Sequence, residues 1–143
     1  MLAYCDTSAL IKRYVDELGR REVLRLLRRY DCATSAISLV ELKSALKRRV
    51  AERHVAGPRL PEFLSRVVED RSYWTVVEVG PEVLSGAEAL LAVHSIGTVG
   101  AIHVASAQLL ANRLSTANVI FVTADERQAD VASAIGLVTR HVA

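Results

Sequence analysis

The stretch LAYCDTSAL, residues 2–10, decides the fold of this chain. Its first four residues are apolar and suit a short buried strand, and Asp6-Thr7-Ser8 then offer side chains that can cap a helix. A buried strand that runs directly into a helix is typical of α/β proteins. Asp6 is unusual at this place, because a carboxylate drawn into a dry core costs several kcal/mol unless its charge is compensated.

The alternation of strands and helices continues to the end of the chain. Further strands are expected at residues 32–35, 73–79, 119–122 and 137–139. Helices are expected at 9–14, from the residue after Gly19 to Tyr30, from a cap at Ser35 or Ser38 to His54, and at 61–69, 81–94, 99–113 and 125–134. The pattern predicts one α/β domain over residues 1–143, a parallel sheet of about five short strands flanked by helices on both faces.

Two more acids have apolar surroundings. Glu41 lies inside the run AISLVEL, and Asp125 comes shortly after the strand expected at 119–122. Ligands of parallel sheets gather beyond the carboxyl ends of the strands, and both Asp6 and Asp125 follow such an end. We therefore expect these two acids to meet at one edge of the sheet, where the buried start of the next long helix brings Glu41.

A shared divalent cation is the simplest common reason for three such carboxylates. Like charges a few ångströms apart repel and desolvation adds to the cost, whereas Mg²⁺ or Mn²⁺ removes both penalties. Such an ion can activate a water and offset charge on a phosphodiester transition state. The hydroxyls of Thr7, Ser8 and Thr123 could bind a metal water or hold a carboxylate in place, and helix capping is their alternative role.

Capping is also the competing interpretation of Asp6 and Asp125, whereas it does not explain Glu41 in a helix interior. The chain lacks the Cys/His spacing of a zinc site and the glycine-rich loop of a P-loop or dinucleotide fold. His103 lies in an apolar helix and is expected to be a satisfied core histidine rather than a general base.

Composition supports an ordered protein with an aliphatic core. Hydrophobic residues make up 51% of the chain and aromatic residues 5%, and the mean hydropathy is +0.24. Because no uninterrupted apolar run reaches about 18 residues and no signal-peptide pattern begins the chain, we expect no membrane span and a cytoplasmic location. Cys5 and Cys32 are isolated in β-like runs, and we expect both thiols to be buried and reduced.

The charge is unevenly distributed, although the net charge is only +2. Residues 12–53 hold twelve of the 18 Lys and Arg residues and six of the 16 acids. A polyanionic partner and a pair of solvated helix faces both explain this excess. The candidate RNA contacts are Arg21, Arg25, Lys47 and Arg48. Binding through phosphates would weaken steeply with salt.

Four motifs, in this order, resemble those of PIN-domain ribonucleases: LAYCDTSAL at 2–10, SLVEL at 38–42, SIGTVGAIHVASA at 95–107 and FVTAD at 121–125. Length and motifs are most similar to VapC-type toxins of bacterial toxin–antitoxin pairs. The resemblance implies a three-layer PIN-like fold and an endoribonuclease dependent on Mg²⁺ or Mn²⁺. It also implies a homodimer and a cognate antitoxin that covers the active site. The metal-site acids it implies are Asp6, Glu41 and Asp125.

The third motif departs from the family at Gly100, which stands where the family carries an aspartate. Glycine in a helix interior costs roughly 1 kcal/mol relative to alanine, so the residue is also unusual on physical grounds. A lost carboxylate would weaken the metal site and attenuate the enzyme.

Two explanations of Gly100 stay open, a toxic nuclease disarmed by selection or engineering and a natural copy that only binds antitoxin or RNA. A third hypothesis is a structure-specific DNA nuclease, but the chain lacks long insertions that could clamp DNA.

Overall fold

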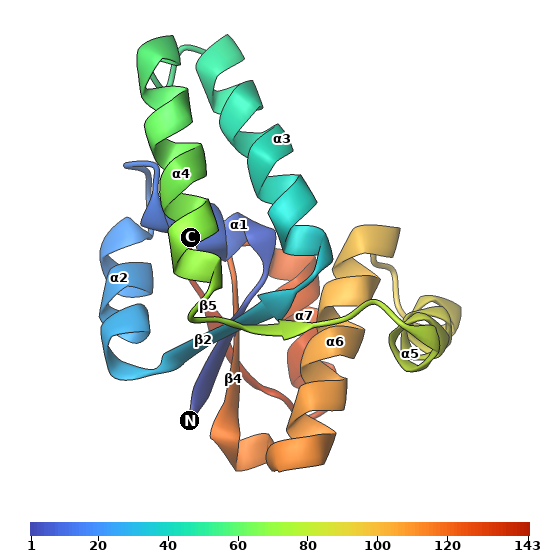
Figure 1. The fold of residues 1–143 in the computed structure, drawn as a ribbon. Coiled ribbons are helices and arrows are strands. Elements are labelled where there is room, and N and C mark those ends of the chain that lie inside the picture. The colour runs from blue at the N-terminus through green and yellow to red at the C-terminus, as the bar shows by residue number, and fades with distance from the viewer.

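The computed structural model describes residues 1–143 and has a five-stranded parallel sheet at its centre, in the order β3-β2-β1-β4-β5 (Figure 1). The strands are β1 (Leu2–Cys5), β2 (Asp31–Ser35), β3 (Thr75–Val77), β4 (Val119–Thr123) and β5 (Val138–His141). Ala3 of the central strand pairs with Cys32 on one side and Ile120 on the other. The predicted parallel sheet is confirmed.

Seven α-helices surround the sheet. They are α1 (Thr7–Leu10), α2 (Arg20–Arg29), α3 (Ile37–Ala51), α4 (Leu60–Arg71), α5 (Pro81–Val93), α6 (Thr98–Leu114) and α7 (Glu126–Ala134). The single helix expected at 9–14 is wrong, because α1 ends after one turn and a 3₁₀ turn (Ile11–Arg13) continues it. The strand expected at 73–79 is shorter in the structure, since β3 is an edge strand that pairs only with β2.

The sheet separates two apolar clusters, which confirms the three-layer architecture. Ala3 and Cys5 face one cluster with residues of α1, α2, α3 and α4. Tyr4 between them faces the other, with residues of α5, α6 and α7. Successive side chains of a strand point to opposite faces, so an apolar strand buries residues on both sides. Cys5 and Cys32 are both buried and unbridged, as expected.

Helices α3 and α4 lie side by side and project beyond the carboxyl edge of the sheet, while the N-terminus lies at the opposite edge (Figure 1). The start of α3, which we expected to be buried, is only partly so. Leu42 and Leu46 are buried, but Val40 is 71% exposed, because α3 is covered on one side only. The helix ends at Ala51 rather than His54.

Helix α6 is the most enclosed helix, with every residue from Gly100 to Ala107 buried. No single helix of the chain is long and apolar enough to cross a membrane. Taken together, helices α5 and α6 have the length and apolar composition of a membrane-crossing segment, but the two are bent by 120° relative to each other. Helix α6 packs against β2 and β4 of the sheet, and α5 packs against α6.

Candidate functional site

Asp6 lies where β1 ends and α1 begins, at the carboxyl edge of the sheet. Its Oδ1 accepts a hydrogen bond of 3.0 Å from the backbone N–H of Ala9, so it caps α1. The Ser8 hydroxyl lies 2.8 Å from both carboxylate oxygens, and the Thr123 hydroxyl donates to Oδ2 at 2.9 Å. Asp6 is 1% exposed, and burial raises its pKa despite these donors. No Lys, Arg or His forms an ion pair with it.

Glu41 reaches from α3 into a buried polar network. Its Oε1 accepts a hydrogen bond of 2.7 Å from the hydroxyl of Thr7 and lies 2.7 Å from His103 Nε2. An ionised carboxylate only accepts, so Nε2 carries the hydrogen and donates. The other ring nitrogen, Nδ1, lies 3.1 Å from the hydroxyl of Tyr4 on β1. Four elements, β1, α1, α3 and α6, therefore contribute one side chain each to this network.

The electrostatics of Glu41 differ from those of Asp6. Burial raises the pKa of Glu41, but hydrogen bonds from His103 and Thr7 outweigh burial and hold the pKa below its usual value. Glu41 is therefore ionised at neutral pH. His103 is buried and its ring nitrogens have hydrogen-bond partners, as expected for a core histidine. One partner is Glu41, so His103 belongs to the candidate site, which the sequence did not predict.

Asp125 is exposed at the start of α7 and takes a capping role. Its Oδ1 accepts a hydrogen bond of 3.0 Å from the backbone N–H of Gln128. Its own backbone N–H donates at 3.0 Å to the Thr123 hydroxyl, the group that also donates to Asp6. A single hydroxyl thus connects two of the predicted acids. Capping, the competing interpretation of Asp6 and Asp125, is seen in the structure for both.

The predicted acids reach one edge of the sheet without forming a compact cluster. No three Asp, Glu, His or Cys side chains lie close enough together to hold a metal ion. The role of Asp6, Glu41 and Asp125 as metal ligands stays a prediction. The donors nonetheless suit a hard divalent cation, because Mg²⁺ is often held by one or two carboxylates together with waters and substrate phosphates. Asp6 has the matching property, a buried carboxylate with no ion pair.

The predicted hydroxyl residues all contact a carboxylate. Thr7 donates to Glu41, while Ser8 and Thr123 donate to Asp6. The Ser8 oxygen also accepts a hydrogen bond of 2.9 Å from the backbone N–H of Ala124, so it joins α1 to the end of β4. These hydroxyls fix the orientation of both carboxylates.

Gly100 lies in the first turns of α6 and is buried. Its backbone has no left-handed geometry, but a Cβ at this position would lie 3.1 Å from Gln128 Cγ and 3.1 Å from Ile96 Cγ1. A glycine is therefore required here because the side chains of Gln128 and Ile96 approach the backbone closely, and not because of a turn. Gln128 is 8% exposed, and its Oε1 has no hydrogen-bond partner. No sequence pattern indicates this contact, since Gln128 lies 28 residues after Gly100 along the chain.

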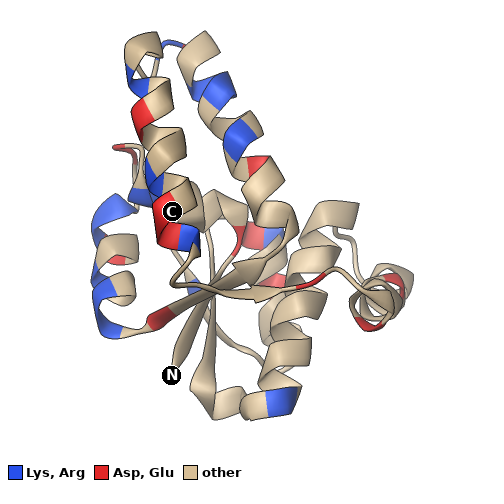
Figure 2. Cartoon of the chain, viewed as in Figure 1, with Lys and Arg blue, Asp and Glu red and all other residues tan.

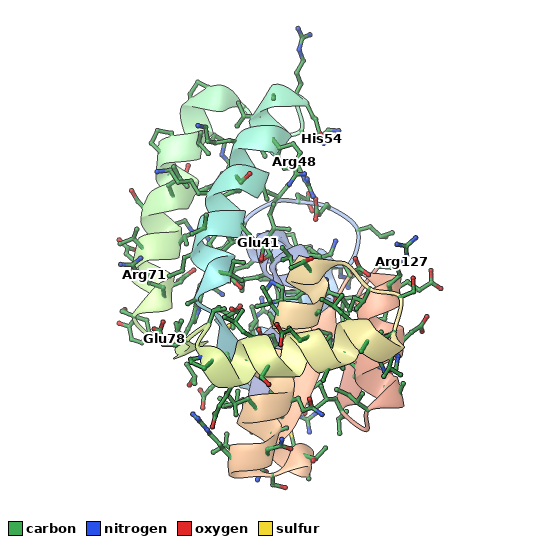
Figure 3. All side chains as sticks on the ribbon, turned by 90° about the vertical axis from the view of Figure 1, so that its right-hand side faces the viewer. Glu41, Arg48, His54, Arg71, Glu78 and Arg127 are labelled. Carbon is green, nitrogen blue, oxygen red and sulfur yellow. The ribbon has the colours of Figure 1, made fainter.

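The predicted RNA contacts fall into two separate groups. Arg21 and Arg25 lie on α2 beside the sheet, and Lys47 and Arg48 lie in the outer half of α3 (Figure 2). Figure 3 shows Arg48 on the same side of α3 as Glu41. Seven residues separate them, about two helical turns or 10 Å. Arg48 therefore lies on the face of α3 that carries Glu41.

Comparisons with known proteins extend over nearly the whole chain. A sequence profile of the PIN domain family matches residues 3–134. Comparison with curated proteins gave no match. Among solved structures, a toxin–antitoxin complex from Klebsiella pneumoniae is similar with a TM-score of 0.64 and 20% identity over 88% of both chains.

Two further structures have the same fold. FitAcB from Neisseria gonorrhoeae has a TM-score of 0.65 and 13% identity over 96% of this chain and 95% of that chain. VapBC2 from Rickettsia felis, bound to a DNA fragment from their promoter, has a TM-score of 0.61 and 15% identity over 100% of both. At these identities the similarity establishes the fold.

Proposed function

The chain belongs to the PIN domain family, and from this premise we propose that it is a divalent-metal-dependent endoribonuclease, the toxin of a toxin–antitoxin pair. One observation carries the proposal. Asp6 and Glu41, 35 residues apart, are held by hydroxyls at the carboxyl edge of a parallel sheet. Ligands of such sheets bind at this edge.

Asp6 and Glu41 would hold Mg²⁺ or Mn²⁺, with Asp125 beside them. When bound there, the ion would lower the pKa of a water molecule and offset charge on the phosphodiester. Thr7 and His103 keep Glu41 ionised and oriented, and Ser8 and Thr123 orient Asp6. The hydroxyls of Ser8 and Thr123 carry no charge, so they orient the Asp6 carboxylate without neutralising it.

The remaining partners follow from the same proposal. Arg48 would contact RNA phosphates near the acids, with Lys47, Arg21 and Arg25 as further contacts. A cognate antitoxin is proposed because one similar structure is a toxin–antitoxin complex. A homodimer is proposed from the resemblance to VapC-type toxins alone. A toxin that cuts cellular RNA would act in the cytoplasm.

A second candidate function is a binding module without catalysis. The observation that favours it is the absence of three closely grouped metal-ligating side chains, together with Gly100 at the expected aspartate. Under this alternative the fold retains antitoxin or RNA binding and has no metal-dependent turnover. In the nuclease proposal, by contrast, Gly100 only attenuates the rate.

The two functions separate in one assay of cleavage of structured RNA with Mn²⁺. The nuclease proposal predicts slow cleavage that chelation abolishes and that Glu41→Gln reduces at least tenfold. The matched control is Glu88→Gln, the same change at an exposed position on α5. If Glu41→Gln and Glu88→Gln leave the same residual cleavage, or if no RNA is cut, the binding module is the better description.

A further inference from the structure

The side chain of Gln128 fills the space that a side chain at position 100 would take. A Cβ built on Gly100 would meet Gln128 Cγ at 3.1 Å and Cδ at 3.3 Å. Both are tighter than ordinary van der Waals contact, so the carboxamide lies against the bare backbone of α6. The fit depends on both residues, because any side chain at position 100 would displace Gln128.

The carboxamide is buried but incompletely bonded. Gln128 is 8% exposed, and its Oε1 has no hydrogen-bond partner, the only buried side-chain oxygen or nitrogen of the chain in this state. Buried polar groups almost always have a partner, so an orphan acceptor at a candidate site indicates a missing donor or cation. A carbonyl oxygen is also a ligand that Mg²⁺, Mn²⁺ and Ca²⁺ accept.

Gln128 lies between the groups that carry the proposed site. Its backbone N–H donates to Asp125, whose own N–H reaches Asp6 through Thr123. On the other side, Gly100 lies one turn before His103 on α6, and His103 contacts Glu41. The side chain thus extends from the turn that holds Asp125 to the turn of α6 that leads to the Glu41 network.

We propose that the carboxamide oxygen of Gln128 serves as a neutral ligand of a divalent cation, in place of the carboxylate that position 100 lacks. This inference rests on the cation-dependent function proposed above. A carboxamide ligand in place of the carboxylate differs from the loss of a ligand, because the site would keep its number of protein oxygens and lose only one negative charge. Affinity for divalent cations rises with the number of negatively charged ligands, so the native chain would bind Mn²⁺ more weakly than a variant with an added carboxylate.

Titration of Mn²⁺ followed by water-proton relaxation tests the inference without measuring catalysis. Gln128→Glu restores a charge at the same length, and we expect the Kd to fall about tenfold. Gln128→Leu removes the oxygen at similar volume, and we expect the Kd to rise about tenfold. The matched control is Gln108→Glu on α6, eight residues or about 12 Å along the helix from Gly100, for which we expect a change of less than twofold.

Asp6→Asn separates failure of this inference from failure of the proposed function, since asparagine still caps α1. If Asp6→Asn abolishes Mn²⁺ binding while both Gln128 variants bind like the native chain, Gln128 is no ligand and the cation site stands. If Asp6→Asn binds Mn²⁺ as tightly as the native chain, or the native chain binds none, both are overturned. Circular dichroism and Tm without metal verify that each variant is folded.

Discussion

His103 Nε2 lies 2.7 Å from Glu41 Oε1, and this contact connects the middle of α6 to the second turn of α3. The His103 side chain is 1% exposed and the Glu41 side chain 28% exposed, so the hydrogen bond is shielded from water on the His103 side. Its other nitrogen is held by the hydroxyl of Tyr4 in the central strand. The orientation of Glu41 is thereby set by the core of the protein rather than by its own helix.

Replacing His103 by leucine is expected to raise the pKa of Glu41. Burial, which raises this pKa, would remain, while the strongest hydrogen bond that lowers it would be lost. Stability should fall by about 1–3 kcal/mol, because Glu41 and Tyr4 lose their partner. NMR titration of the Glu41 carboxyl carbon measures the pKa, and chemical denaturation measures the stability.

The control is His94→Leu at the end of α5, a partly buried histidine without a side-chain hydrogen bond in the structure. That change should leave the Glu41 titration where it is. An unchanged Glu41 pKa in His103→Leu would contradict the network described above.

Gly100→Ala should stabilise the protein only when Gln128 is shortened. Alanine gains about 0.5–1 kcal/mol over glycine in a helix, but its Cβ would lie 3.1 Å from Gln128 and Ile96 in the native background. In a Gln128→Ala background part of this crowding is removed, and the gain should appear. A double-mutant cycle of unfolding free energies measures the coupling.

Gly86→Ala is the matched change, since Gly86 lies on α5 and its Cβ would meet Ala105 at 3.3 Å, away from Gln128. Its effect should be the same in both backgrounds. Equal effects of Gly100→Ala in the two backgrounds would show that Gln128 does not control the space at position 100.

Restoring the aspartate at position 100 should increase RNA cleavage most when Gln128 is also shortened. Gly100→Asp alone places the new carboxylate in the space that Gln128 fills. We expect Gly100→Asp/Gln128→Ala to exceed Gly100→Asp by tenfold or more in Mn²⁺-dependent cleavage, because the carboxylate can then take its orientation. A single variant as active as the double would count against the crowding.

Arg48→Glu should weaken RNA binding more than Arg25→Glu does. Both changes reverse one charge. Arg48 lies on α3, on the same side as Glu41 (Figure 3), whereas Arg25 lies on α2. Loss of one phosphate contact lowers the slope of log affinity against log salt by about 1. Filter binding at several salt concentrations, with Mg²⁺ replaced by chelator, measures the RNA affinity and its salt dependence. Equal losses of affinity in the two variants would indicate that RNA also contacts α2.

Acid should remove the stabilisation that Asp70 provides between α4 and the turn after α1. Arg13 donates to Asp70 at 2.7 and 3.0 Å, and the Tyr14 hydroxyl donates at 2.8 Å. Burial raises the pKa of Asp70, but these donors outweigh burial and lower the pKa below its usual value. The contribution is therefore complete above the unfolded pKa of about 3.9 and is lost as pH falls through the lower folded value.

Asp70→Asn should lower stability by about 1–2 kcal/mol at pH 7 and by less near pH 2. The neighbouring Glu69→Gln, at an exposed position, serves as the control and should change stability by less than about 0.5 kcal/mol. Urea unfolding at a series of pH values gives both curves. A difference between Asp70→Asn and the native chain that does not shrink in acid would contradict the ion pair.

Periodicity and apolar runs predicted the sheet well, because β1 and β4 are buried on both faces and their sequences are continuously apolar. The same reasoning failed for Val40, an apolar residue that is exposed because α3 is covered on one side only. It also failed after Leu10, where a helix of one turn becomes a 3₁₀ turn. Local sequence does not predict which side of a helix is covered by the rest of the protein, or where the helix ends.

The sequence predicted which acids and hydroxyls lie near one edge of the sheet, but it did not predict their other contacts, and their function stays a prediction. Asp6 and Asp125 follow strand ends, a position that topology alone brings to one edge. The contacts of His103 with Glu41 and of Gln128 with Gly100 join helices that are distant in the chain, and no periodicity encodes them. They could be found only from the packing of α6 against α3 and α7.

Positions 6 and 100 differ in what an organism loses when they mutate. Asp6 caps α1 and connects β1 to β4 through Thr123, so replacing it would weaken the scaffold together with the proposed metal site. Gly100 contributes only free space beneath Gln128. If the function proposed above holds, a lineage could weaken this protein at position 100 and leave its outer surface unaltered, and such a copy would compete with active relatives for a shared inhibitor.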